Sequence, residues 1–170
     1  MLTLFYIIIF IELLTVFYNL FKFLLYKLFS SSNKQHNNVK NSNNDFHINV
    51  LIPCYNEISI ISNTLNYFEK ITKNFNNIDI YVITTDKEKS ENPKNTQTTY
   101  EYLLSLEIFN NSNFHILNFP HSSGMMADQL NFAITEIQKV QNLPNNKIYF
   151  SIYNADSNPD NGTFDELMEK

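Results

Sequence analysis

Polar residues that could bind a metal ion follow an apolar run near residue 150. The segment 153–159 reads YNADSNP, with a carboxylate at Asp156 and an amide oxygen two positions earlier at Asn154. Hard divalent cations take such oxygen ligands and commonly bridge to substrate phosphates. The same residue types also make ordinary turns, so the local pattern leaves a metal site and a simple turn both open.

A second polar segment follows the apolar run before residue 53. Pro53 ends that run, Tyr55 offers a flat ring, and Glu57 lies where a helix is expected to start. These side chains can hold a base and a ribose. The alternative is a strand-to-helix turn in which Asn56 is the N-cap. A nucleophilic Cys54 is disfavoured, because no motif ties a histidine to it.

A third segment, HSSGMMADQLN at 121–131, holds one of the two glycines of the chain. Its Asp128 and Asn131 either point at a ligand or lie on the solvated face of a helix. The four histidines show no spacing typical of metal ligands. The chain has neither G-x-G-x-x-G nor G-x-x-x-x-G-K-[ST], which disfavours a dinucleotide enzyme and a P-loop ATPase.

Charge and composition narrow the possible partners. The chain has 170 residues, a formal net charge of −5, and twelve basic residues that are all lysine. Because it has no arginine and no basic block, we expect no nucleic-acid binding. A bound phosphate would be met by backbone N–H groups, lysine or a metal ion. Cys54 is the single cysteine, so no internal disulfide can form.

Apolar strands alternate with helix-period segments from residue 47 onward. We expect strands at 47–53, 78–84, 114–117 and 147–153, and helices at about 56–75, 100–108, 126–140 and from 163. This alternation predicts an α/β domain, with a mainly parallel sheet and helices on both faces. Ligands of such sheets bind at the carboxyl ends of the strands, which here are the segments 53–57, 84–88, 118–124 and 154–159.

The N-terminal 29 residues are predicted to form one transmembrane anchor. Residues 2–21 are almost wholly apolar, and about 20 such residues cross a bilayer core. Glu12 costs ~3 kcal/mol at mid-span, which roughly a dozen large apolar residues at ~0.3–0.6 kcal/mol each outweigh. A cleaved signal peptide would need a basic start and a small-residue cleavage site, and neither is visible.

Lysines follow the predicted span and none precedes it, so we expect a single-pass membrane protein whose remaining chain is cytoplasmic. Residues 30–46 are polar and are expected to be a flexible linker. Residues 47–170 then form the α/β domain.

Four segments, in this order, resemble family 2 glycosyltransferases of the GT-A fold. They are VLIPCYNE at 50–57, YVITTDKE at 81–88, MADQLNFAI at 126–134 and IYNADSNPD at 152–160. The last is similar to the D-x-D metal motif of that family. The resemblance implies a Rossmann-like GT-A domain that transfers a sugar from a nucleoside-diphosphate sugar to an acceptor hydroxyl, with inversion.

The resemblance also implies site residues and a cofactor. Asp156 would bind Mg²⁺ or Mn²⁺, which neutralises the departing diphosphate. The residues expected to bind the nucleotide sugar are Pro53, Tyr55, Glu57, Thr85, Asp86, Asn131 and Asn154. The acceptor stays unknown.

The chain departs from the family pattern at three positions and in its length. Asn154 replaces the first acid of D-x-D, Thr84-Thr85 stands where two acids are usual, and Met126 occupies a lysine position. In the family the catalytic base comes later than the metal motif, and no resembling motif remains here. We therefore expect the N-terminal, donor-binding part of such an enzyme, truncated before its catalytic residues.

Two other functions stay open. The first is a truncated, non-catalytic remnant, tethered to the membrane, that binds a nucleotide or a partner subunit. The second is a nucleotidyltransferase, which would also use carboxylates and Mg²⁺. It is the weaker of the two, because the chain lacks a glycine-rich, basic phosphate loop.

Overall fold

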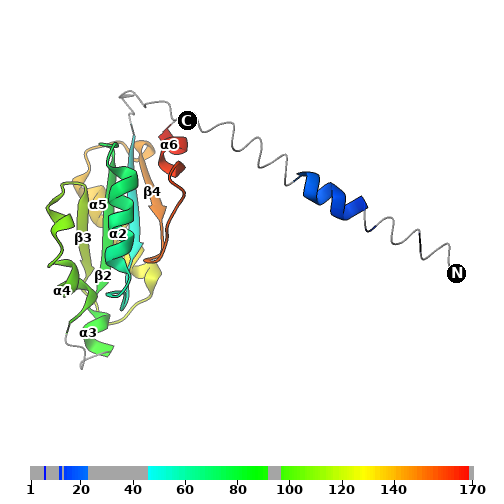
Figure 1. Ribbon diagram of the computed structural model, residues 1–170. Coiled ribbons are helices and arrows are strands. Elements are labelled where there is room, and N and C mark those ends of the chain that lie inside the picture. The colour runs from blue at the N-terminus through cyan, green and yellow to red at the C-terminus, as the bar shows by residue number, and fades with distance from the viewer. Residues whose placement is uncertain (1–5, 7–11, 13, 23–45, 92–96, 169–170) are drawn as a thin grey trace. The chain divides into compact units, whose positions relative to one another are not determined.

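The computed structural model describes residues 6, 12, 14–22, 46–91 and 97–168 (Figure 1). The chain divides into two units, Met1–Lys40 and Asn41–Lys170. In the first unit residues 14–22 are helical, and large apolar side chains such as Leu14 and Phe17 are exposed. No helix in the described ranges is long and apolar enough to cross a membrane. Most of the predicted anchor, and almost all of the predicted linker, lie outside those ranges.

The second unit is built on a four-stranded parallel sheet. Its strands are β1 (His47–Pro53), β2 (Ile78–Thr85), β3 (Phe114–Phe119) and β4 (Ile148–Ile152). They lie in the order β3-β2-β1-β4, and each neighbouring pair is parallel (Figure 1). The expected α/β architecture with a parallel sheet is confirmed, and the strand order is that of a Rossmann-like half.

Helices cover both faces of the sheet, as predicted. The two long ones are α2 (Ile61–Thr72) and α5 (Met126–Val140), which lie on opposite faces in Figure 1. The shorter elements are α3 (Lys87–Glu91), α4 (Thr99–Leu103), η1 (Glu107–Asn110), η2 (Asn145–Lys147) and α6 (Thr163–Met168). The helix expected at 100–108 is split into α4 and η1, and α3 was not predicted.

Successive residues of β1 explain why its sequence is apolar throughout. Val50 and Ile52 belong to the core on the α2 side, where they join Phe68. Leu51 points to the other face and packs with Ala133 of α5. Side chains alternate along a strand, so a strand covered on both faces has no polar side to show.

The prediction that Asn56 is the N-cap of the first helix is wrong. That helix, α2, begins at Ile61, and its N-cap residue is Ile60. Asn56 instead has a φ of 58°, in the left-handed region that asparagine tolerates better than most residues. The N–H groups of Ile60 and Ile61 donate to the Glu57 carbonyl at 3.2 and 3.0 Å. Glu57 therefore belongs to the loop after β1 and not to the helix.

Candidate functional site

The strand order places a crevice between the carboxyl ends of β1 and β4. From β1 the chain builds outward through β2 and β3, and then β4 is added on the other side of β1. Loops leave in opposite directions at such a switch point, which is where open α/β sheets bind ligands. A hollow of about 670 Å³ lies there. Its lining residues are Pro53, Cys54, Tyr55, Glu57, Ile60, Lys87, Gly124, Met125, Met126, Gln129, Asn154, Ala155 and Asp156.

The loop after β1 brings Pro53, Tyr55 and Glu57 to this hollow. The Tyr55 hydroxyl donates a hydrogen bond to the Glu91 carboxylate, which fixes the ring. The Lys87 ammonium lies 5.6 Å from the centre of the same ring. Tyr55 thus presents a held aromatic ring at the pocket.

The loop after β4 brings Asn154 and Asp156 to the same hollow. The Asn154 N–H donates to the Ser157 hydroxyl at 3.0 Å, and the Ser157 N–H returns to the Asn154 carbonyl at 3.0 Å. The carbonyl of buried Ala155 accepts a hydrogen bond from the Thr64 hydroxyl on α2. These bonds hold the backbone of the loop and leave the exposed Asp156 side chain facing the hollow.

The oxygen groups at the hollow fit a metal ion that is shared with a ligand. Asp156 and Glu57 supply carboxylates, and Asn154 supplies an amide oxygen. Within the described ranges, no group of three or more His, Cys, Asp or Glu side chains could hold a metal by itself. Mg²⁺ is commonly bound by one or two carboxylates plus substrate phosphates, so this donor set suits that arrangement better than a closed protein cage.

Three predicted residues do not line this hollow. Thr85 is buried, and its hydroxyl accepts from the Lys87 N–H at 3.2 Å and donates to the His121 carbonyl at 3.3 Å. The Asp86 carboxylate accepts from the Asn118 amide at 2.7 Å. Asn131 lines a second hollow of about 570 Å³, together with Asp128. Thr85 therefore supports the neighbouring loops, while Asp86 and Asn131 lie apart from the residues after β1 and β4.

Lys87 is a site residue that the sequence analysis missed. Among the described residues that line the larger hollow, it is the one cation. Its ammonium donates to the Gly124 carbonyl at 3.3 Å and pairs with Glu91 at 3.6 Å. The signal was its position directly after β2, at the carboxyl edge of the sheet.

Gln129 was missed as well. It is only 6% exposed and lines the larger hollow. The signal was its spacing, because Ala133 and Ile137 follow it by one and two helical turns and are both buried. A polar residue in a buried stripe needs a partner or a function.

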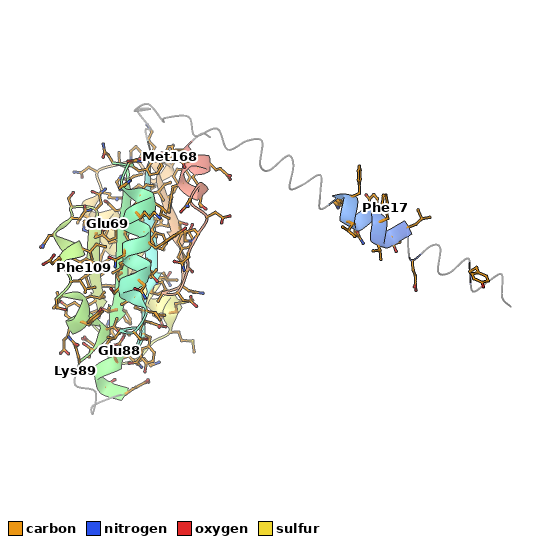
Figure 2. The ribbon with its side chains drawn as sticks, in the orientation of Figure 1. Phe17, Glu69, Glu88, Lys89, Phe109 and Met168 are labelled. Carbon is orange, nitrogen blue, oxygen red and sulfur yellow. The ribbon has the colours of Figure 1, made fainter. Side chains whose placement is uncertain are left out.

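Glu88 holds the loop after β1 through a hydrogen bond to its backbone. It lies on α3, is 2% exposed and is labelled in Figure 2. Its carboxylate accepts hydrogen bonds from the Asn56 N–H at 2.8 Å and the Thr99 N–H at 2.7 Å. It thereby joins the left-handed turn at Asn56 to the start of α4.

Cys54 does not fit a nucleophilic role. Burial, and then the negative charges of Glu57 and Glu88, raise the pKa of its thiol far above the usual range. The thiolate is the reactive form, so this cysteine behaves as a core residue, as the sequence analysis favoured.

Comparison with known proteins finds no match for this chain among family models, curated proteins or solved structures. The assignment of an α/β fold with a four-stranded parallel sheet comes from the structure alone.

Proposed function

We propose that the domain binds a nucleoside-diphosphate sugar with Mg²⁺ or Mn²⁺ and forms the donor-binding part of a family 2 glycosyltransferase of GT-A type. One observation carries this proposal. The loops at 53–57 and 154–156 are about a hundred residues apart in sequence, yet both line one hollow at the switch point. A volume of about 670 Å³ lies within the range of small-molecule sites.

Each wall of the hollow suits a different part of such a donor. The held ring of Tyr55 offers a stacking surface to a nucleobase. Asp156 and Asn154 offer oxygen atoms to the metal ion, which when bound neutralises charge on the departing diphosphate. Glu57 is placed to accept hydrogen bonds from ribose or sugar hydroxyls.

In the reaction we propose, an acceptor hydroxyl displaces the nucleoside diphosphate from the sugar with inversion. That step needs a base to take the hydroxyl proton. In the described part of the chain, the carboxylates that line the hollow are Glu57 and Asp156, and the proposal already uses both for the donor. No catalytic residue is therefore assigned here.

The missing base favours one alternative, a domain that binds the nucleotide or a partner without turnover. Binding of the donor and transfer of its sugar are separable in an assay. A domain that binds a sugar nucleotide but transfers nothing to any acceptor would fit the alternative.

Removal of the Asp156 carboxylate tests the donor site. We expect the full chain, in mild detergent, to bind sugar nucleotides more tightly with Mn²⁺ than without it. Asp156→Ala should weaken this binding at least about tenfold, which corresponds to ~1.4 kcal/mol. Asp160→Ala is the matched control, since Asp160 does not line the hollow. Calorimetry that detects no metal-dependent binding to the wild type at millimolar ligand would reject the proposal.

We also propose that residues 1–29 anchor the chain in a membrane and leave the domain in the cytoplasm. The exposed apolar side chains of the helical residues 14–22 support an apolar environment for that segment. A reporter fused after Lys40 should be active only on the cytoplasmic side. Activity on the opposite side would refute this topology.

A further inference from the structure

The buried stripe of α5 is interrupted by one polar side chain where it reaches the hollow. Ala133 and Ile137 of this stripe pack against Leu51 and Ile83 of the sheet. Gln129 lies one turn before Ala133 and is more than nine-tenths buried. The stripe therefore carries an amide at the position where the sheet ends and the hollow begins.

The Gln129 amide has no hydrogen-bond partner among the described residues, although neighbouring buried polar groups are paired. In those ranges, every side-chain nitrogen or oxygen that is completely enclosed does have a partner. The Gln129 amide must therefore open onto the hollow that it lines. The amide therefore keeps its hydrogen-bonding capacity for whatever fills the hollow, either water or a bound ligand.

The groups around Gln129 favour an anion. The Lys87 ammonium lies at the same hollow and is held in place by the Gly124 carbonyl at 3.3 Å. The α5 helix has 15 residues, and its amino end at Met125 and Met126 also lines the hollow. An ammonium, an amide N–H₂ and the positive end of a helix dipole all attract negative oxygen atoms.

Part of the amino end of α5 is already occupied, which limits how an anion can approach. The Asp128 carboxylate accepts a hydrogen bond from the Met125 N–H at 2.7 Å. The Asp128 and Gln129 N–H groups donate to the Met125 carbonyl at 3.0 and 3.3 Å. A ligand would thus reach the N–H of Met126, which no described residue accepts, beside the Gln129 amide.

Gly124 allows the tight turn whose carbonyl holds the Lys87 ammonium. Its φ is +122°, and a Cβ atom there would lie 3.1 Å from both Asp128 Oδ2 and Phe119 Cε1. A larger residue would displace the carbonyl that holds Lys87. The close packing of this turn therefore fixes the position of the ammonium.

We infer that Gln129 and Lys87, with the first turn of α5, bind the phosphoryl oxygens of the ligand directly, as an anion site that works without the metal ion. The inference rests on the proposed function for the identity of the ligand, a nucleoside diphosphate. It assigns the metal to the loop after β4 and the direct phosphate contacts to α3 and α5.

Binding of inorganic pyrophosphate to the full chain in detergent, with EDTA present, tests the anion site. Wild type should bind. Gln129→Leu and Lys87→Gln should each weaken binding by about five- to tenfold, the loss typical of a charge-assisted or buried hydrogen bond. Gln129→Glu keeps the size of the side chain and should weaken binding further, by charge repulsion. Gln138→Leu, an exposed glutamine of the same helix, should bind as wild type does.

Thermal melting of the ligand-free variants separates loss of binding from loss of fold. Gln129→Leu should melt at or above the wild-type temperature. If Gln129 had only a structural role, its replacement would lower the melting temperature. Wild-type affinity in both Gln129→Leu and Lys87→Gln overturns the inference, and so does a wild type that binds no pyrophosphate in EDTA.

Failure of the inference and failure of the proposed function give different results. If sugar nucleotides bind with Mn²⁺ and depend on Asp156, but ignore Gln129 and Lys87, only the anion site is rejected. If pyrophosphate binding depends on Gln129 and Lys87, but sugar nucleotides do not bind, the anion site stands and the sugar donor is rejected.

Discussion

The two ends of the parallel sheet both carry polar side chains, but these side chains are paired differently. At the amino end, His47 Nε2 lies 2.9 Å from one Asp79 oxygen, and His115 Nε2 lies 3.7 Å from the other. At the carboxyl end, Asp156 and Gln129 face a hollow, and no described residue hydrogen-bonds to either side chain. Polar groups that pair with each other have little capacity left for a ligand, whereas the open ones at the hollow keep that capacity.

Two glutamines at opposite ends of α5 show the same difference. Gln141, which follows α5 directly, exchanges two hydrogen bonds with the Asn49 side chain, at 3.0 and 2.8 Å. Asn49 is fully buried in the sheet. Gln129 has the same side chain near the start of the helix and makes no such bond. Two residues of the same type are therefore paired differently, and it is the free amide that makes Gln129 a candidate for ligand binding.

The largest expected change in stability comes from Glu88, which holds the loop after β1 at the carboxyl end of the sheet. Glu88→Ala removes the acceptor of two backbone N–H groups, and hydrogen bonds to a charged group are worth ~1.5–3 kcal/mol each, so the free energy of unfolding should fall by about 3 kcal/mol. Glu88→Gln keeps one acceptor oxygen and should lose less. Thermal and urea unfolding of the full chain measure both.

Lys89→Ala is the control for Glu88, since Lys89 is on the same short helix and is exposed. It should change stability by no more than about 0.5 kcal/mol. Equal midpoints for Glu88→Ala and Lys89→Ala would show that the loop after β1 does not depend on Glu88.

The next largest effect is a loss of stability at low pH, which we expect from Asp79 at the amino end of the sheet. Burial raises the pKa of Asp79, but hydrogen bonds and charge from His115 and His47 outweigh it and lower the pKa from 3.8 to about 2. The folded protein therefore binds this proton less readily than the unfolded chain. The stabilisation by ionised Asp79 is complete above pH 4 and is lost as the pH falls towards 2.

Asp79→Asn removes this titration, so its stability relative to wild type should change by about 2 kcal/mol between pH 5 and pH 2. His47→Gln removes the 2.9 Å contact and should remove part of the same acid dependence. Wild type and Asp79→Asn that lose stability in parallel across this range would show that the His–Asp–His group does not stabilise the fold.

The sequence predicted the strands and helices around the hollow better than the side chains that line it. The run at 47–53 and the alternation of strands with helices were enough to predict a parallel sheet. The hollow lies at the carboxyl edge of that sheet, where the sequence analysis expected a ligand. The prediction that Asn56 is a helix N-cap was wrong. Its left-handed conformation depends on a hydrogen bond to Glu88, which comes 32 residues later. Lys87 was missed because its place at the hollow depends on α3 and on the Gly124 carbonyl. Gln129 was within reach, since its spacing to Ala133 and Ile137 marks it as buried.

The smallest predicted effects differ in sign between the two glutamines. Gln141→Leu leaves the buried Asn49 amide without its partner, so stability should fall by about 1–2 kcal/mol while ligand binding stays unchanged. Gln129→Leu replaces an unpaired amide with an apolar side chain beside Ala133, so the ligand-free domain should gain up to about 1 kcal/mol. Gln138→Leu, on the exposed face, should do neither.

Thermal melting without ligand measures all three variants. A loss of similar size in Gln129→Leu and Gln141→Leu would mean that Gln129 is a structural residue with a partner in solution. A gain in stability combined with a loss of pyrophosphate binding is the pattern expected of a residue retained for its ligand, because the unpaired amide then destabilises the empty domain and is satisfied only when the site is filled.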